Sequence, residues 1–158
     1  MEHTILDRRR RRFPARRRAV AALSLALFCH PAQACWQEVA QWYGVNVHLL
    51  YAIAKTESNL NPLARNQNKN GSYDIGLMQI NSSWLPTLRK YGLDESQLKD
   101  PCVNLQVGAW ILSQNMQRLG ATWEAVGAYN AKNPQLRIKY AQKVYQNIPA
   151  AARLQSDR

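Results

Sequence analysis

The spacing of apolar residues predicts a protein built mainly from helices. Between residues 46 and 59, Leu50, Ile53 and Ala54 share one helical face, and the acid Glu57 follows one turn later on the same face. Asn46 is a suitable N-cap, because its side-chain oxygen can accept from the first free backbone N–H groups. The pattern therefore predicts a helix over residues 46–59 with a carboxyl group at the end of its apolar face.

Four further segments have helical patterns with recognisable ends. Helices are predicted over residues 36–44, 122–130 and 133–148. A longer helix is predicted over residues 100–120, where Asp100 is the N-cap, a proline follows at the first helical position and a glycine ends the segment. Along this helix we expect one buried stripe, formed by Val103, Val107, Trp110, Ile111 and Gln114.

Residues 66–81 break the helical pattern. They begin with polar residues, contain the turn-forming pair Asn70-Gly71, and then alternate between apolar and polar side chains. We therefore expect a small β-hairpin that leads into a buried segment. The expected fold class is mainly α, within the α+β class: a helical domain with one small β-hairpin element.

The first 34 residues have the three-part pattern of a secretory signal peptide. An arginine block over residues 8–18 precedes an apolar run and an A-x-A cleavage site at residues 32–34. The run is too short to span a bilayer, so we expect no transmembrane segment after cleavage and a periplasmic location. Three alternatives stay open: a basic arm for nucleic acid or membranes, twin-arginine export through Arg11-Arg12, and lipid attachment at Cys35. Because the apolar run follows the arginines directly, we expect no nucleic-acid partner.

Removing the predicted signal peptide changes the charge of the chain. The segment holds eight arginines against two acids, so +6 of the net +11 leaves with it, and 13 basic and 8 acidic residues remain at +5. A mildly basic protein suits an anionic polymer such as the bacterial wall, as well as other partners. The remaining chain makes one domain of ordinary size, expected to be a monomer, with its folded part over 35–148 and a loose tail over 149–158.

Two cysteines, Cys35 and Cys102, remain after the predicted cleavage removes Cys29. In an oxidising periplasm they can pair with each other, and the alternative is a buried free thiol at one of them. Such a disulfide would stabilise the fold by about 4 kcal/mol at most on the chain-entropy model. With His48 as the one histidine left, these residues form no metal constellation, and we expect neither a metal nor a cofactor.

Glu57 is the most informative residue of the chain. A carboxyl group at the end of an apolar helical face lies toward the interior, where desolvation opposes ionisation and raises its pKa. A general acid that works near neutral pH needs such a pKa. The alternative is a solvent-exposed Glu57 paired with Lys55 or Arg65, and spacing alone does not decide between the two.

Three short motifs follow one another along the chain: ESNLNP at 57–62, GLMQIN at 76–81 and AYN at 128–130. In this order they resemble the motifs of the soluble lytic transglycosylases, which have a lysozyme-like fold. The longer stretch from Cys35 to about Tyr145, with CW, DPCVN and GAWIL, resembles the small exported members that accompany type III and type IV secretion, conjugation and pilus systems. Many relatives continue AYNAG where this chain has AYNAK, which leaves open the path of the following loop.

The resemblance implies a role for each matching residue. Glu57 would be the catalytic acid and then base, and Gln79 would line the sugar-binding cleft. Tyr129 would hydrogen-bond toward Glu57 or the scissile sugar, with Asn130 supporting the loop. The implied reaction cleaves the β-1,4 bond between N-acetylmuramic acid and N-acetylglucosamine in peptidoglycan glycan strands and forms a 1,6-anhydromuramoyl end.

Asp74 leaves the chemistry open. The stretch GSYDIGLMQINSSW at 71–84 also resembles the strand segment of animal c-type lysozymes, in which the matching aspartate is the second carboxylate. Asp74 can cap the hairpin and shape the substrate-binding cleft, support a positive transition state, or act as the nucleophile of a hydrolase. The alternatives to a lytic transglycosylase are therefore a muramidase that uses Asp74 and a non-catalytic wall-binding module of a secretion, conjugation or pilus apparatus.

Overall fold

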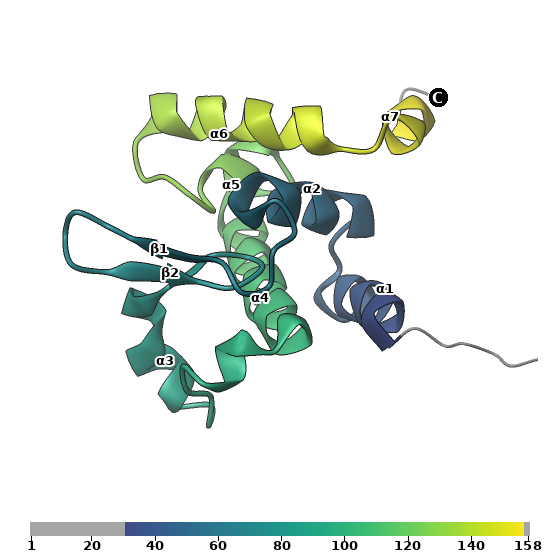
Figure 1. Ribbon diagram of the computed structural model, residues 1–158. Helices are drawn as coiled ribbons and strands as arrows, with labels where there is room; N and C mark the ends of the chain where they lie inside the picture. The colour runs from purple at the N-terminus through teal and green to yellow at the C-terminus, as the bar shows by residue number, and fades with distance from the viewer. Residues whose placement is uncertain (1–30, 157–158) are drawn as a thin grey trace, which may run out of the picture.

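A computed structural model describes residues 31–156, and in this part of the chain the expected mainly α architecture with a small sheet is confirmed (Figure 1). The helices are α1 (Pro31–Tyr43), α2 (Val47–Ser58), α3 (Leu85–Arg89), α4 (Pro101–Leu119), α5 (Trp123–Gly127), α6 (Pro134–Asn147) and α7 (Ala150–Ser156). The strands are β1 (Arg65–Gln67), β2 (Tyr73–Ile75) and β3 (Ile80–Asn81), and two short 3-10 helices are η1 (Ser82–Trp84) and η2 (Gln97–Lys99). The signal peptide predicted over 1–34 lies almost wholly outside the described residues, although α1 already begins at Pro31. None of the helices from α1 to α7 is long and apolar enough to cross a membrane.

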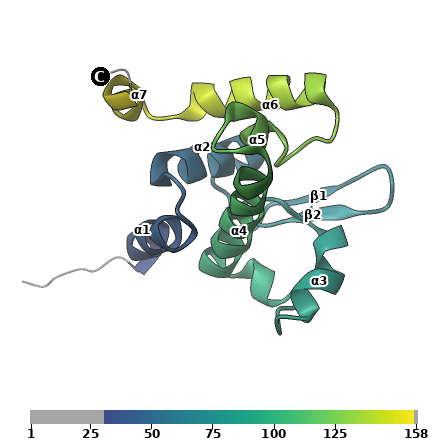
Figure 2. The ribbon, with the colours of Figure 1, turned by 180° about the vertical axis from the view of Figure 1, so that it is seen from behind.

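Helix α4 lies at the centre of the molecule. Figures 1 and 2 show α1 on one side of it, the β-hairpin on the other, and α6 across one end. α4 contacts α1, α5 and β3. Fully buried side chains from α2, the loop after β2, α4 and α6 form one core cluster, which includes Leu50, Met78, Leu105, Leu112 and Val144. Burial of this apolar surface therefore joins the early and late helices to α4.

The buried face of α4 is wider than the stripe predicted from the sequence. Val107 and Ile111 are buried as expected, whereas Gln114 is exposed. The buried face also includes three polar residues, Asn104, Ser113 and Asn115. Because α4 is contacted from several directions, it does not have the one narrow apolar stripe of a surface helix.

The C-terminal segment also differs from the expected loose tail. Residues Ala150–Ser156 form α7, which lies beyond the end of α6 in Figure 1. Three successive alanines follow Pro149, and the backbone N–H groups of Ala152 and Arg153 donate to the Pro149 carbonyl. Alanine is the strongest helix former, so local propensity outweighs the low apolar content of this segment.

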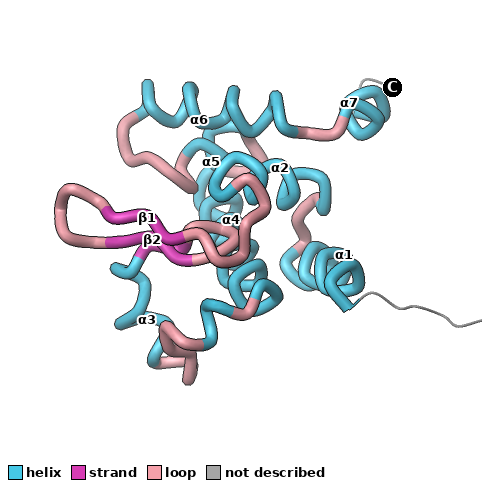
Figure 3. The backbone as a smooth tube through the Cα atoms, in the orientation of Figure 1, coloured by secondary structure: helices cyan, strands magenta, loops and turns pink. Residues whose placement is uncertain are grey.

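The three strands form an antiparallel sheet in the order β1-β2-β3, and Figure 3 shows the β1–β2 hairpin projecting to one side of the helices. The predicted hairpin is confirmed, with Gly71 in its turn at a φ of 84°, which glycine adopts without strain. The register places Asn66 opposite Asp74, and Asp74 opposite Asn81. Directly opposite residues share one face of a sheet, so both asparagines face Asp74.

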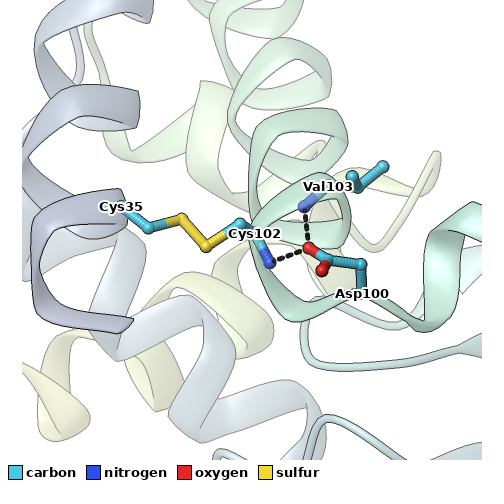
Figure 4. The surroundings of a disulfide bond; sticks show 4 residues. All are labelled: Cys35, Asp100, Cys102 and Val103. Atoms are coloured by element: carbon cyan, nitrogen blue, oxygen red, sulfur yellow. Dashed lines mark hydrogen bonds between the residues drawn. A yellow bond between two sulfur atoms is a disulfide. The ribbon is translucent and has the colours of Figure 1, made fainter. Parts of the chain in front are cut away.

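A disulfide joins Cys35 of α1 to Cys102 of α4, with the two Cα atoms 5.9 Å apart (Figure 4). The pairing considered for these two cysteines is therefore present in the structure. Beside it, Asp100 Oδ1 accepts from the backbone N–H groups of Cys102 at 2.8 Å and Val103 at 2.9 Å. The predicted N-cap of α4 is thus confirmed, and cap and disulfide together hold the first turn of α4 in place.

Asn104 connects α4 to the loop that follows β2. Its buried Nδ2 donates to the carbonyl oxygens of Ile75 and Leu98, both at 2.9 Å. Its Oδ1 accepts from the Met78 backbone N–H at 2.7 Å. Gly76 makes this approach possible, since a Cβ atom there would lie 2.4 Å from Asn104 Nδ2. One side chain therefore satisfies three backbone groups and seats the loop on α4.

We expect Asn104→Ala to lower the free energy of unfolding by about 3 kcal/mol, because it leaves buried backbone groups without partners. Asn115→Ala is the matched control on the same helix, since Asn115 is also buried but its Nδ2 has no partner among the described residues. Its Oδ1 accepts from Arg118 at 3.1 Å, so its truncation should cost less. Chemical denaturation of both variants measures the difference. Equal losses would show that the Asn104 hydrogen bonds contribute no more than the lost side-chain volume.

Candidate active site

Glu57 lies in the last turn of α2, where its partly buried carboxyl group faces α6. Its Oε1 accepts a hydrogen bond from the hydroxyl of Tyr140, 83 positions later in the chain. The exposed pairing with Arg65 that the sequence left open is not found, because Arg65 Nη1 pairs with Glu95 Oε1 at 2.8 Å. The apolar face of α2 thus directs Glu57 into the contact between α2 and α6.

The surroundings of Glu57 raise its pKa to about 7. Burial is the main cause, because it removes the water that would solvate the carboxylate. The hydrogen bond from Tyr140 opposes this effect by favouring the charged form, and the negative charge of Asp74 adds to the increase. A carboxyl group with this pKa can both donate and accept a proton near neutral pH.

Two tyrosines stack beside Glu57, and their contacts differ from the expectation. Of the two partners that the resemblance implies for Tyr129, Glu57 is bound by Tyr140 instead. The hydroxyl of Tyr129 donates to the Met78 carbonyl at 3.0 Å. The two rings lie nearly parallel, with centroids 6.5 Å apart and 13° between their planes. Burial raises the pKa of both tyrosines, so their hydroxyls remain donors. Asn130, the last residue of the AYN motif, is exposed.

The loop after β2 is tied down by its own motif residues. The partly buried Gln79 folds back on the loop: its Nε2 donates to the carbonyls of Gly76 at 2.8 Å and Ala64 at 3.2 Å. Ser58, next to Glu57 in the chain, donates from Oγ to the Leu77 carbonyl at 2.7 Å. The three sequence motifs therefore meet at this loop, which brings Gln79 into the region of the catalytic candidate.

Asp74 is held by three asparagine amides. Its Oδ1 accepts from Asn81 Nδ2 at 2.7 Å. Its Oδ2 accepts from Asn68 Nδ2 at 3.0 Å and from Asn66 Nδ2 at 3.4 Å. The sheet register supplies Asn66 and Asn81, and the hairpin turn supplies Asn68. The orientation of the carboxylate is thus fixed, and its charge acts on Glu57 through space.

A further cluster joins the sheet to the segment before α4. Glu95 accepts from Arg65 Nη1 at 2.8 Å and from the Tyr73 hydroxyl at 2.5 Å. The guanidinium carbon of Arg65 lies 3.9 Å from the centre of the Tyr73 ring. An exposed ion pair contributes little alone, but these three contacts together hold β1 and β2, and with them Asp74, against the segment that leads into α4.

The arrangement supplies proton transfer by one carboxyl group beside a fixed negative charge. Glu57 can donate and recover a proton, and Asp74 can stabilise positive charge that develops nearby. Within residues 31–156, the histidine, cysteine, aspartate and glutamate side chains form no group of three that could hold a metal ion. Glu57 and Asp74 together fit acid–base cleavage of a bond whose transition state is positively charged.

Sequence reasoning missed Tyr140 and the three asparagines around Asp74. The asparagines had only a partial signal, because a two-residue turn at Asn70-Gly71 would place Gln67 opposite Asp74, whereas the register found places Asn66 there. Tyr140 had a weaker one, since a buried tyrosine on an apolar helix face needs a partner for its hydroxyl. Nothing in the surrounding sequence of Tyr140 pointed to Glu57 as that partner.

Comparisons with known proteins agree with this geometry. Residues 34–153 match the family described as "Transglycosylase SLT domain". The "Invasion protein IagB" of Salmonella typhimurium is 47% identical over 118 residues, which cover 72% of this chain and 74% of that protein. "Protein IpgF" of Shigella flexneri is 42% identical, over 70% of this chain and 76% of that protein. A "Peptidoglycan-binding-like protein" of Escherichia coli O157:H7 is 39% identical, over 72% and 75%.

Among solved structures, the lytic transglycosylase Slt of Pseudomonas aeruginosa has a TM-score of 0.59 and 26% identity over 73% of this chain. The chain spans 23% of the length of that protein, which was solved as an inactive mutant with glutamine in place of a glutamate. The lysozyme-like fold expected from the motifs is confirmed by this likeness. The chain therefore belongs to the family of transglycosylase SLT domains, and its folded part is a lytic transglycosylase domain.

Proposed function

We propose that this protein cleaves the β-1,4 bond between N-acetylmuramic acid and N-acetylglucosamine in peptidoglycan and leaves a 1,6-anhydromuramoyl end. The observation that carries the proposal is the carboxyl group of Glu57, with its pKa raised to about 7 beside Tyr140 and Asp74. The family match supports the reaction class, and a related protein is inactive with glutamine in place of a glutamate. Glu57 is accordingly assigned as the catalytic acid and then base.

In the first step, the protonated Glu57 gives its proton to the glycosidic oxygen. The bond between that oxygen and C1 of the muramoyl sugar breaks, the glucosamine side leaves as an alcohol, and positive charge develops at C1. The hydroxyl of Tyr140 stabilises the carboxylate that Glu57 becomes. The fixed charge of Asp74 stabilises the positive sugar.

In the second step, the Glu57 carboxylate removes the proton of the C6 hydroxyl of the same muramoyl sugar, and that oxygen attacks C1. The new C1–O6 bond closes the anhydro ring and returns Glu57 to its protonated form, so no water is consumed. The attacking hydroxyl belongs to the substrate and is present at high effective concentration. The reaction therefore needs one carboxyl group for proton transfer.

A muramidase that hydrolyses the same bond is the second candidate function, because Asp74 is a second carboxylate that acts on Glu57. As a nucleophile, Asp74 would attack C1 and water would release the product. Both of its oxygens already accept amide hydrogen bonds, which favours an electrostatic role over attack. A non-catalytic wall-binding module, the third reading, has no use for an acid with a pKa near 7.

The remaining motif residues are assigned to the walls of the cleft. Because the Nε2 of Gln79 is used within its own loop, we assign its Oε1 to the substrate. Tyr129 holds this loop through the Met78 carbonyl and supports the ring of Tyr140. Asn130 supports the turn that follows Tyr129.

The proposed setting is the periplasm, reached after removal of residues 1–34. The disulfide between Cys35 and Cys102 suits an oxidising compartment. One relative is named an invasion protein and another a peptidoglycan-binding-like protein. We therefore assign the protein, acting as a monomer, to local opening of the wall for a secretion, conjugation or pilus apparatus.

Glu57→Gln keeps the shape of the side chain and removes its proton, and we expect muropeptide release from purified sacculi to fall by ~100-fold to 10,000-fold. Lysis by the folded variant at the rate of the parent protein would refute the catalytic assignment.

Glu57→Gln should also be more stable than the parent protein at alkaline pH. The raised pKa means that protonation of Glu57 adds stability that is fully present below pH 4.5 and lost as the pH rises through about 7. Glu57→Gln should thus melt at a higher temperature than the parent well above pH 7 and at nearly the same temperature at pH 4.5.

The pH dependence of cleavage offers a paired test of the groups around Glu57. Activity should fall as the pH rises through about 7, because the general acid loses its proton. Tyr140→Phe removes a hydrogen bond that lowers this pKa, so the alkaline limb should move to higher pH. Asp74→Asn removes a charge that raises it, so the limb should move to lower pH. Rates on sacculi across this range measure both shifts, and shifts in the same direction would contradict the assignment.

The products of Asp74→Asn separate the lyase from the hydrolase. We expect this variant to lose ~10-fold to 100-fold in rate, or roughly 1.4 to 2.8 kcal/mol of electrostatic support, and still to release 1,6-anhydromuropeptides. Mass spectrometry distinguishes the ends, since hydrolysed ends carry an added water and are about 18 mass units heavier. Hydrated ends from the parent protein, together with an inactive Asp74→Asn, would instead establish the muramidase.

A further inference from the structure

A cavity of about 850 Å³ lies between α5 and α6, outside the site described above. Both helices pack against each other, and Figure 2 shows α5 directly beside α6. On α6, the cavity-lining residues Ile138, Gln142 and Tyr145 lie about 140° to 160° around the helix axis from Tyr140, at 100° per residue. This α5–α6 groove therefore lies on the side of α6 that faces away from Glu57.

Two aromatic rings give the groove an apolar surface. Trp123 of α5 and Tyr145 of α6 meet edge to face, with centroids 5.5 Å apart and 79° between their planes. Each remains 46% exposed, and Ile138 beside them is 60% exposed. Aromatic surface left open in this way is typical of binding sites, because the rings lose little conformational freedom when a ligand covers them.

Polar side chains line the rest of the groove. Gln142 and Gln146 are exposed and four residues apart on α6, so their amides lie on the same side of the helix. Arg137 Nη1 and Glu124 Oε1 form an ion pair at 3.0 Å across the two helices. Amides both donate and accept hydrogen bonds, so the lining suits a ligand that combines apolar C–H faces with hydroxyl and acetamido groups.

The charge around the groove favours an anionic polymer. Between residues 120 and 156 the chain has five basic residues and one acid, Glu124. Lys139 and Lys143 are exposed on α6, and the guanidinium carbon of Arg153 lies 5.8 Å from the centre of the Tyr145 ring. Wall glycan carries carboxylates on its muramoyl substituents, so ligand and surface have opposite charges.

We propose that the α5–α6 groove is a second glycan-binding site, which holds an amino-sugar strand of the wall away from the catalytic cleft. The inference rests on the proposed function, because it takes wall glycan as the ligand. Sugar rings would lie on Trp123 and Tyr145, and their acetamido groups would hydrogen-bond to Gln142 and Gln146. Such a site keeps the enzyme on the insoluble wall while a different part of the strand occupies the cleft beside Glu57.

The test is co-sedimentation with purified sacculi, with every protein also carrying Glu57→Gln so that the wall stays intact. We expect Trp123→Ala to weaken binding about tenfold, a common effect of removing an aromatic anchor. Trp42→Ala is the matched control, because Trp42 is 84% exposed on α1 and does not line this groove, and it should bind as the parent does. A Gln142→Ala and Gln146→Ala double variant changes exposed side chains only and should weaken binding in the same direction.

Peptide-free glycan strands serve as the second probe. Weaker binding of Trp123→Ala and of the double variant to both sacculi and peptide-free strands supports the proposal. Unchanged binding to the peptide-free strands overturns it, and so does a loss of self-association by light scattering with glycan binding intact. Failure of the proposed function is separate, since it would be seen as muropeptide release by Glu57→Gln and not in these binding curves.

Discussion

A carboxyl group that stays protonated near neutral pH has to be withdrawn from water, and the packing around Glu57 follows from this constraint. The face of α2 that buries Leu50 and Ile53 also carries Glu57, so burial of the helix draws the acid inward. A buried polar group without a partner is costly, and Tyr140 provides the partner. The site therefore exists only when α6, late in the chain, packs on α2.

The loop after β2 is also held in place, by hydrogen bonds to its backbone. Asn104 reaches it from α4, Ser58 from the residue after Glu57, and Tyr129 from the turn after α5. Each of these three bonds meets a backbone group, and they act together with the side chain of Gln79, which binds the Gly76 and Ala64 carbonyls. Tyr129 also stacks on Tyr140, so the acid, its donor and the loop form one connected unit. A change at Asn104, near the start of α4, can thus alter the surroundings of Glu57 through the loop, Tyr129 and Tyr140.

Local signals predicted α1, α2, α4, α5, α6 and the acid, but not α3, α7 or the contacts that give the acid its properties. A helix cap such as Asn46 or Asp100 binds backbone N–H groups two and three residues later. A short stretch of sequence is therefore enough to predict it. The partner of Glu57 lies 83 positions away, and Tyr140 resembles any core tyrosine in its surroundings. The stripe predicted for α4 was too narrow and wrongly included Gln114 for a related reason, because a central helix is packed on several sides and its pattern no longer marks one face.

The two carboxyl groups of the site lie in unlike environments, and the proposed mechanism uses that difference. Glu57 is desolvated and given one donor, which suits a group that must hold and release a proton. Asp74 is given amide donors on both oxygens, so its charge is oriented before a substrate binds and needs no rearrangement when positive charge develops. The same amides engage the lone pairs that a nucleophile would use. A site built in this way can keep a second carboxylate for electrostatic support and still leave the attack to the hydroxyl of the sugar itself.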